Sequence, residues 1–228
     1  WSHLGAVGDV SGGLTKNSRR SALPLRFPYL RVANVYANRL ELEEVHEIGA
    51  TEVEYKRTLL ARGDLLFVEG NGSIDQIGRV AIWNGSIHPC LHQNHLIKCR
   101  SVIPDMAKFI MYWFLSHLGR SVVIHEASST SGLHTLSISK VGSLRIPVAC
   151  LAEQHRIVDE IESRFSVLDE LDKAVDHGLE QAEALRQSIL KKAFEGRLLT
   201  EAELAAVRND PEYEPADKLL ECIRAQTG

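Results

Sequence analysis

Apolar residues recur at every third or fourth position through a long stretch in the second half of the chain, and no proline interrupts it. From Ile157 to Ala193, ten steps cover 36 positions, which matches the 3.6-residue period of an α-helix. The pattern predicts one helix from Leu151 to about Phe194, which would be roughly 65 Å long at about 1.5 Å per residue. Its apolar stripe consists of Ile157, Ile161, Phe165, Leu168, Leu171, Val175, Leu179, Ala182, Leu185, Ile189 and Ala193.

A helix of this length with an uncovered apolar stripe would aggregate in water, so the stripe needs a partner. The residues before it are too few to cover the whole stripe by folding back onto it. We therefore expect a coiled coil with a partner helix, whose interface on this chain is formed by Ile157, Ile161, Phe165, Leu168, Leu171, Val175, Leu179, Leu185 and Ile189.

The first part of the chain has shorter patterns that are typical of strands and loops. Alternation or compact apolar runs predict strands at 30–35, 65–68, 79–83 and 95–99, with a last extended segment at 144–147. Helical spacing predicts one helix that begins at Pro104-Asp105 and ends at Gly119. The glycine- and serine-rich segment 5–15 is expected to be a loop. The fold class is therefore α+β, a mixed sheet followed by one long helix.

The charge changes sign where the helix begins. Residues 1–150 have 16 Lys and Arg against 12 Asp and Glu, a net charge of +4, and residues 151–228 have 10 against 18, a net charge of −8. A basic globular head followed by an acidic helix indicates a chain that binds a polyanion at its basic end and other proteins at its acidic end. We expect a DNA-recognition head over 1–148, the long helix over 149–199, and a tail over 200–228 with one short helix at 217–224.

Composition restricts the class of protein. No apolar run is long enough to span a membrane, and no signal peptide opens the chain, so we expect no membrane partner. The four cysteines lack a CxxC pair, which favours free thiols in a cytoplasmic protein. The chain begins at Trp1 rather than Met, which favours a fragment or a processed chain.

Two constellations could indicate catalysis or metal binding, and both are weak. His88, Cys90, His92, His95 and Cys99 do not have the spacing of a zinc site. Residues 54–56, Glu-Tyr-Lys, match half of a nuclease metal site without the upstream acidic partner. Phosphate-binding loops and nucleophile elbows are missing from the sequence. We expect no catalytic residues, no metal and no cofactor, although a nuclease or methyltransferase fragment stays open as an alternative.

The polar loops of the head have the residue types that read DNA. Arg pairs with guanine, and Asn and Gln pair with adenine, whereas hydroxyls and further cations suit phosphates. A net charge of +4 is modest, so much of the affinity has to come from a larger assembly. The candidate DNA-binding residues are Lys16, Asn17, Arg19, Arg20, Arg31, Asn34, Asn71, Gln76, Arg79, Gln93, Asn94, Ser129, Thr130, Ser131, His134 and Lys140.

Several segments resemble the specificity subunits of type I restriction–modification systems. In the head these are Phe-Pro-Tyr-Leu-Arg-Val-Ala-Asn at 27–34, Gly-Asp-Leu-Leu-Phe at 63–67 and His-Gln-Asn-His-Leu-Ile at 92–97. The most specific is Glu-Ala-Leu-Arg-Gln-Ser-Ile-Leu-Lys-Lys-Ala-Phe-Glu-Gly-Arg-Leu-Leu at 183–199, which resembles the family's conserved spacer helix. Gly78-Arg79, Ile146-Pro147, the segment 153–158 and the tail from Asp210 extend the resemblance over essentially the whole chain.

The resemblance implies a non-catalytic subunit that reads one half of a bipartite double-stranded DNA target. The long helix would pair antiparallel with a counterpart helix and fix the spacing of the half-sites. Methyltransferase and restriction endonuclease subunits would be the partners, and they would use S-adenosylmethionine, ATP and Mg²⁺. The location would be the cytoplasm of a bacterium or archaeon.

The chain departs from the family in number, because a full subunit has two recognition domains and two spacer helices. It is therefore expected to be the second half of such a subunit or a half-subunit that pairs with itself as a dimer. The family's Ile-Pro-x-Pro junction also lacks its second proline at 146–149. A scaffold whose head no longer binds DNA is the remaining alternative.

Overall fold

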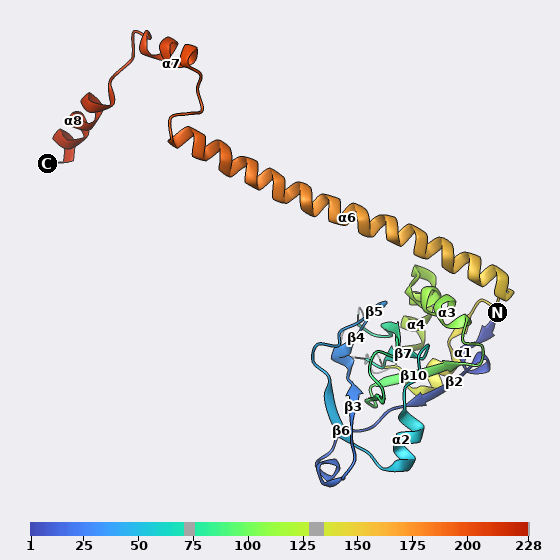
Figure 1. Ribbon diagram of the computed structural model, residues 1–228. Helices are drawn as coiled ribbons and strands as arrows, with labels where there is room; N and C mark the ends of the chain where they lie inside the picture. Colours follow the sequence, from blue (N-terminus) through green and yellow to red (C-terminus); the bar gives the residue numbers. More distant parts are fainter. Residues whose placement is uncertain (71–75, 128–134, 228) are drawn as a thin grey trace. The chain divides into compact units, whose positions relative to one another are not determined.

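The computed structural model describes residues 1–70, 76–127 and 135–227 (Figure 1). The chain forms two compact units, Trp1–Ser163 and Arg164–Gly228. The first unit therefore includes the opening turns of the long helix in addition to the head that we placed at 1–148. The described fold is α+β, as predicted.

A four-stranded antiparallel sheet forms the centre of the first unit, with the strand order β2-β10-β7-β8. Successive side chains of a strand point to opposite faces. In β7, Leu65 and Phe67 enter one apolar cluster, whereas Leu66 and Val68 enter another. Both faces are covered, which explains why this strand is an uninterrupted apolar run. The strands are β2 (Gly8–Gly12), β7 (Leu65–Val68), β8 (Val80–Ile82) and β10 (Leu96–Ser101).

Helices cover one face of this sheet, and α3 and α4 lie on that side in Figure 1. Their apolar residues, including Ile110, Phe114 and Val123, pack with Phe67 of the sheet. The rings of Phe67 and Phe114 meet edge to face at 5.3 Å. The helices of this layer are α1 (Leu4–Val7), α3 (Met106–Leu115), α4 (His117–Ala127) and α5 (Ile138–Ser143).

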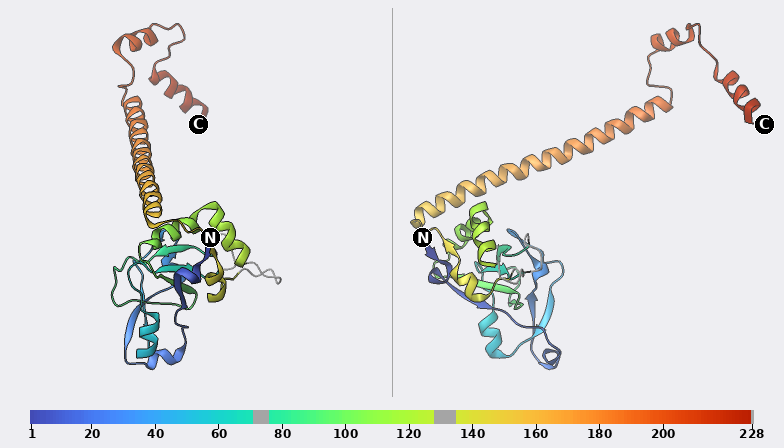
Figure 2. Two further views of the ribbon diagram at one scale, coloured as in Figure 1. Left: turned by 90° about the vertical axis from the view of Figure 1, so that its right-hand side faces the viewer. Right: turned by 180° about the vertical axis from the view of Figure 1, so that it is seen from behind.

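A second sheet lies at the other side of the head, with the strand order β6-β3-β9. Strand β3 is antiparallel to β6 and parallel to β9, and a small cluster around Tyr29, Ile48 and Leu91 packs with it. Figure 2 shows this sheet and α2 from two further sides. The remaining elements are β1 (Ser2–His3), β3 (Arg26–Leu30), β4 (Val35–Tyr36), β5 (Arg39–Leu40), β6 (His46–Gly49), α2 (Glu52–Thr58), β9 (Leu91–His92) and β11 (Arg145–Ile146).

A polar network joins the central sheet to α2. The buried ammonium of Lys98 donates to the carbonyls of Arg57 and Leu59, at 3.2 and 3.4 Å, at the end of that helix. Burial lowers the pKa of Lys98. Beside it, Arg100 donates two hydrogen bonds of 2.7 Å to the buried carboxylate of Asp64. Arg100 also donates to the Leu59 carbonyl at 3.1 Å, so Lys98 and Arg100 supply partners to carbonyls at the end of α2, where the helix itself offers none.

Three expectations about the head were wrong. The segment 5–15 contains β2 rather than a loop, because its glycines allow close approach: a Cβ at Gly8 would lie 2.6 Å from Cys99 Sγ. The strand expected at 30–35 ends at Leu30, and a 3₁₀ helix, Val32–Asn34, follows. The helix expected up to Gly119 divides at Ser116, which is extended, into α3 and α4.

Helix α6 (Leu151–Phe194) has the predicted limits. Its stripe is exposed along the second unit: Leu171 is 56% exposed and Leu179 is 65% exposed. The tail has two helices, α7 (Glu201–Arg208) and α8 (Ala216–Thr227), rather than the one expected. The capping box of Thr200 and Glu203, which begins α7, was missed. Among the described helices, none is both long and apolar enough to cross a membrane.

Candidate nucleic-acid interface

A groove of about 740 Å³ in the head contains three of the predicted DNA-binding residues, Gln76, Arg79 and Gln93. We call it the polar groove. Its amides can both donate and accept hydrogen bonds, and its guanidinium donates, which are the functions that base edges and phosphates require. The other lining residues are Val32, Ala33, Tyr36, Gly70 and His95.

Backbone hydrogen bonds hold the floor of the polar groove. The Gln93 amide donates to the Leu30 carbonyl at 2.9 Å, and the Gln93 carbonyl accepts from Leu96 at 2.9 Å. The Arg79 carbonyl accepts from Val68 at 2.9 Å. Both side chains therefore project from backbone that is tied to the central strands, which suits a surface that has to present donors in a fixed geometry.

Tyr36 and His95 line the polar groove but were not among the predicted DNA-binding residues. His95 Nδ1 lies 2.6 Å from the carboxylate of Glu69, and the side-chain amide of Asn94 lies 3.3 Å from its other ring nitrogen. The guanidinium of Arg79 stacks on the Tyr36 ring at 4.9 Å. A tyrosine and an arginine on either side of a tight turn, at 36–39, are the sequence signal that could have indicated this part of the site.

Arg20 has a structural role in the described chain. Its guanidinium binds both carboxylate oxygens of Glu54, at 2.7 and 3.0 Å, and also donates to the carbonyls of Thr15 and Gly49. These four contacts use four of the five N–H donors of the guanidinium, including the pair that would bind a base in a bidentate way. The neighbouring Lys16, Asn17 and Arg19 are exposed, although the Asn17 side chain caps the 3₁₀ helix Ser18–Ala22.

Asn34 is buried, which corrects its assignment to the DNA-binding surface. Its amide nitrogen donates to the carbonyls of Glu41 and Glu44 at 2.8 and 3.0 Å, and its oxygen accepts from the Arg31 amide at 2.8 Å. The side chain therefore has no donor left for DNA. Arg31 is partly exposed and lies 3.6 Å from the carboxylate of Glu44.

The remaining predicted residues lie elsewhere or outside the described residues. Lys140 is on α5, and its ammonium donates to the carbonyls of Ala127 and Thr135, at 3.4 and 3.2 Å. It is not a lining residue of the polar groove. The predicted DNA-binding residues outside the described ranges are Asn71, Ser129, Thr130, Ser131 and His134.

The ion pair of Arg20 and Glu54 makes stability depend on pH. Hydrogen bonds from Arg20, and then from Thr51, lower the pKa of Glu54 from 4.5 to about 2. A lowered carboxyl pKa stabilises the fold above the unfolded-state value and loses this contribution as the pH falls toward about 2. Glu54→Gln should therefore cost about 1–2 kcal/mol near pH 7.

Urea unfolding of the wild type and Glu54→Gln at several pH values would test this. The difference in unfolding free energy should shrink as the pH falls from about 5 toward 2. The exposed neighbour provides a control, because Glu52→Gln removes only the surface pair with Lys56 and should cost less than about 0.5 kcal/mol. A pH-independent difference for Glu54→Gln would contradict the assignment.

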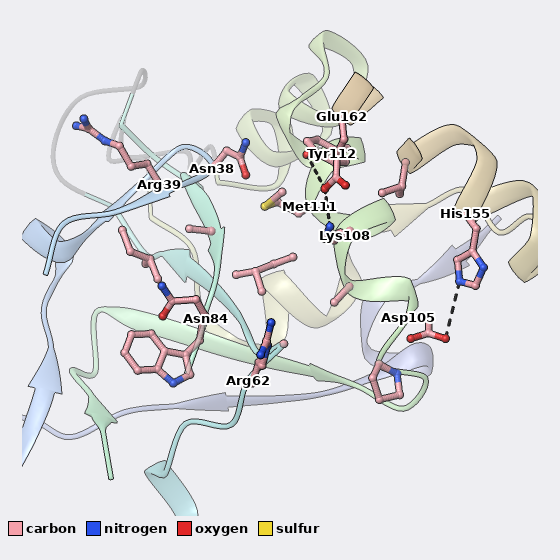
Figure 3. A pocket seen from close by; sticks show the side chains of 18 of the residues that line it. Asn38, Arg39, Arg62, Asn84, Asp105, Lys108, Met111, Tyr112, His155 and Glu162 are labelled. Carbon is pink, nitrogen blue, oxygen red and sulfur yellow. Dashed lines mark hydrogen bonds and ion pairs between the residues drawn. The ribbon is translucent and has the colours of Figure 1, made fainter. Parts of the chain in front are cut away.

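A second cavity, of about 780 Å³, lies between α3, the opening turns of α6 and the edge of the sheet (Figure 3). Its side chains pair with one another. Glu162 accepts from Lys108 at 2.6 Å and from the Tyr112 hydroxyl at 3.4 Å, and His155 Nε2 lies 3.8 Å from the Asp105 carboxylate. Figure 3 shows these links joining α6 to α3. They fix the start of the long helix on the head.

The two weak constellations do not form chemical sites in the structure. Glu54 and Lys56 lie two residues apart on α2, and each has another partner, Arg20 and Glu52 respectively.

Cys90 and Cys99 are in different apolar clusters, and burial raises the pKa of each thiol to about 12. All four cysteines are free. Across residues 1–70, 76–127 and 135–227, no group of three metal-ligating side chains occurs.

Comparison with known proteins identifies the relatives of the chain, although no family model matches it. It is 29% identical over 191 residues to the EcoKI specificity subunit of Escherichia coli, covering 83% of the chain and 41% of the relative. It is 28% identical over 233 residues to the StySPI specificity subunit of Salmonella potsdam, covering 98% of the chain and 48% of the relative.

The chain is homologous to type I restriction enzyme specificity subunits. This confirms the resemblance found in the sequence. The chain spans about half the length of these curated relatives. Their names are those of specificity subunits, which agrees with the expectation that the chain is not an enzyme.

Two solved structures share the fold of the chain. The HsdS subunit from Thermoanaerobacter tengcongensis matches with a TM-score of 0.60 and 17% identity, over 84% of this chain and 48% of that one. A chain from a study of type I R-M complex assembly and conformational transition matches with a TM-score of 0.61 and 19% identity, over 87% of this chain and 46% of that one.

Proposed function

We propose that the chain is the DNA sequence-recognition part of a type I specificity subunit and that its head reads one half of a bipartite target. The homology to specificity subunits over most of the chain carries this proposal. The polar groove supports it, because Gln76, Arg79 and Gln93 combine the functions needed for base edges and phosphates at one place.

The long helix would set the distance between two half-sites. Its apolar stripe is exposed beyond residue 163, and a stripe of that extent fits an antiparallel counterpart helix. The counterpart would come from the other half of a longer subunit or from a second copy of the chain. A target split into two short sequences with a fixed spacing follows from this arrangement.

Methyltransferase and restriction endonuclease subunits would be the protein partners. They would supply the chemistry, with S-adenosylmethionine, ATP and Mg²⁺, and the methyltransferase would extrude the adenine from the duplex. The role of this chain would be to bind and orient the DNA. A DNA-modifying activity of the chain itself, or a scaffold role without DNA binding, would be revealed by the experiment that follows.

A methylation map would test the proposal. Cells without other methyltransferases would express the chain with its methyltransferase subunit, and the chain alone or the methyltransferase subunit alone as the two controls. We expect methylation that depends on the chain and occurs at a symmetric split target if two copies pair. Methylation at the same sites without the chain would refute the proposal.

A domain exchange covers the case in which the chain is half of a longer subunit. Residues 1–148 would replace the matching recognition domain of a two-domain relative. One half of the methylated target should then change while the other half stays the same. If that half of the target is lost and no new sequence takes its place, in a folded and active complex, this head does not read DNA.

A further inference from the structure

Two guanidinium groups share one tyrosine ring at the border of the polar groove. The Arg79 guanidinium carbon lies 4.9 Å from the centre of the Tyr36 ring, and that of Arg39 lies 5.0 Å from it. Tyr36 is 36% exposed, and the Arg39 side chain is 66% exposed. We call these three residues the arginine–tyrosine stack. Tyr36 and Arg79 line the polar groove, and Arg39 lines the neighbouring second cavity, so the stack lies at the border between the two.

The backbone holds the stack in one geometry. Tyr36 and Arg39 are cross-strand partners in the hairpin of β4 and β5. The turn between them contains Asn38 at φ 54°, in the left-handed region that Asn adopts readily. The Asn38 amide donates to the Val80 carbonyl at 2.9 Å, so the tip of the hairpin is attached to the residue next to Arg79. Tyr36 and Arg79 therefore keep their relative positions without a ligand.

The charges of the stack are poorly neutralised by the protein. Arg39 lies 3.6 Å from the exposed carboxylate of Glu41. Surface pairs of that kind contribute little. Within the described residues, Arg79 has no ion pair, and its Nε atom is buried without a hydrogen-bond partner. Two cations that share a ring repel each other, and a row of anions removes that repulsion.

We infer that the arginine–tyrosine stack binds the DNA backbone, with Arg39 and Arg79 on phosphates beside the base pairs that Gln76 and Gln93 face. This rests on the proposed function and adds Tyr36 and Arg39 to the residues predicted from sequence. Phosphate contacts fix the register of a protein on the duplex. Tyr36 is a positioning residue in this arrangement, because its ring orients both guanidiniums by cation–π contact.

Salt-dependent binding tests the inference. The protein that carries this chain would be assembled with its methyltransferase subunit, and a fluorescent duplex with the mapped target would be titrated at several salt concentrations. Arg39→Gln and Arg79→Gln should each weaken binding about three- to tenfold and reduce the slope of log affinity against log salt by about 1. Tyr36→Leu should weaken binding by a similar factor, whereas Tyr36→Phe, which keeps the ring, should stay within about twofold.

Arg26→Gln is the matched control, because Arg26 is an exposed arginine on β3 that pairs with Glu47 and is not a lining residue of the groove. It should leave the affinity and the slope unchanged. If Arg39→Gln and Tyr36→Leu behave like this control while the wild type still reads its target, the inference is wrong and the proposed function stands.

The contact of Arg79 with a phosphate would be contradicted by a separate result. If Arg79→Gln relaxes the sequence preference at one base pair without changing the salt slope, Arg79 reads a base rather than the backbone. A wild-type complex that binds all duplexes equally would instead contradict the proposed function. Because Arg39 is largely exposed, its variant should keep the wild-type melting temperature, which separates a binding effect from unfolding.

Discussion

Leu171→Asp should abolish helix pairing and, with it, target methylation by the assembled complex. Leu171 lies midway along α6 in the stripe and is 56% exposed in the chain. In the paired state its side chain would enter an apolar interface, where an unpaired carboxylate costs several kcal/mol. A cost of about 3 kcal/mol or more corresponds to a loss of over a hundredfold in the pairing constant.

The measurement is mass in solution by light scattering, together with methylation of the mapped target. His177→Asp is the matched control, because it places the same carboxylate on the opposite face of the same helix, where His177 is exposed. The control should retain pairing. Both variants should keep the helical circular dichroism of the wild type. If the Leu171→Asp variant pairs at the same concentration as the wild type, the coiled-coil interface is contradicted.

Asp64→Ala should destabilise the head by about 3 kcal/mol, which is a large part of the stability of a small domain. The Asp64 side chain is 2% exposed and receives three hydrogen bonds, two from Arg100 at 2.7 Å and one from the Ala61 amide at 2.8 Å. Charge-assisted pairs with two parallel bonds are among the stronger polar contacts. Their loss also frees the turn that leads into β7.

Asp9→Ala is the control for this effect. Asp9 is also a carboxylate beside Arg100, since the two are cross-strand partners of β2 and β10, but its side chain is exposed. Asp9→Ala should lower the free energy of unfolding by less than about 0.5 kcal/mol. Urea unfolding followed by tryptophan fluorescence reports the head, because Trp83 is buried there. Equal decreases in unfolding free energy for the two variants would show that negative charge near Arg100, rather than the buried pair, stabilises this turn.

The features that were predicted well depend on local patterns. The 3.6-residue period defined α6 because every backbone hydrogen bond of a helix is made within four residues. The compact apolar run at Leu65–Val68 gave β7, since a strand that is buried on both faces has no polar positions. The 3₁₀ helix at Val32–Asn34 was missed because one side chain, Asn34, ends the strand through bonds to residues seven and ten positions away.

The candidate site was predicted only in part. Gln76, Arg79 and Gln93 were recognised by residue type, and the fold brings them together in the polar groove. Arg20 has the same residue type as Arg79, but the path of the chain places Glu54 within 2.7 Å of it. Residue type therefore indicates what a side chain can bind, and burial and neighbours decide what it does bind.

The sequence by itself determined the long helix, the apolar stripe along it, the free thiols and the relationship to specificity subunits. These depend on local hydrogen bonding, on spacing and on motifs that lie within short segments. Only the tertiary structure decided that Asn34 is buried, that Arg20 has a structural role, and that Tyr36 stacks with Arg79. Each of these contacts joins residues that are far apart along the chain or depends on how closely strands pack, so its energy exists only once the chain is folded.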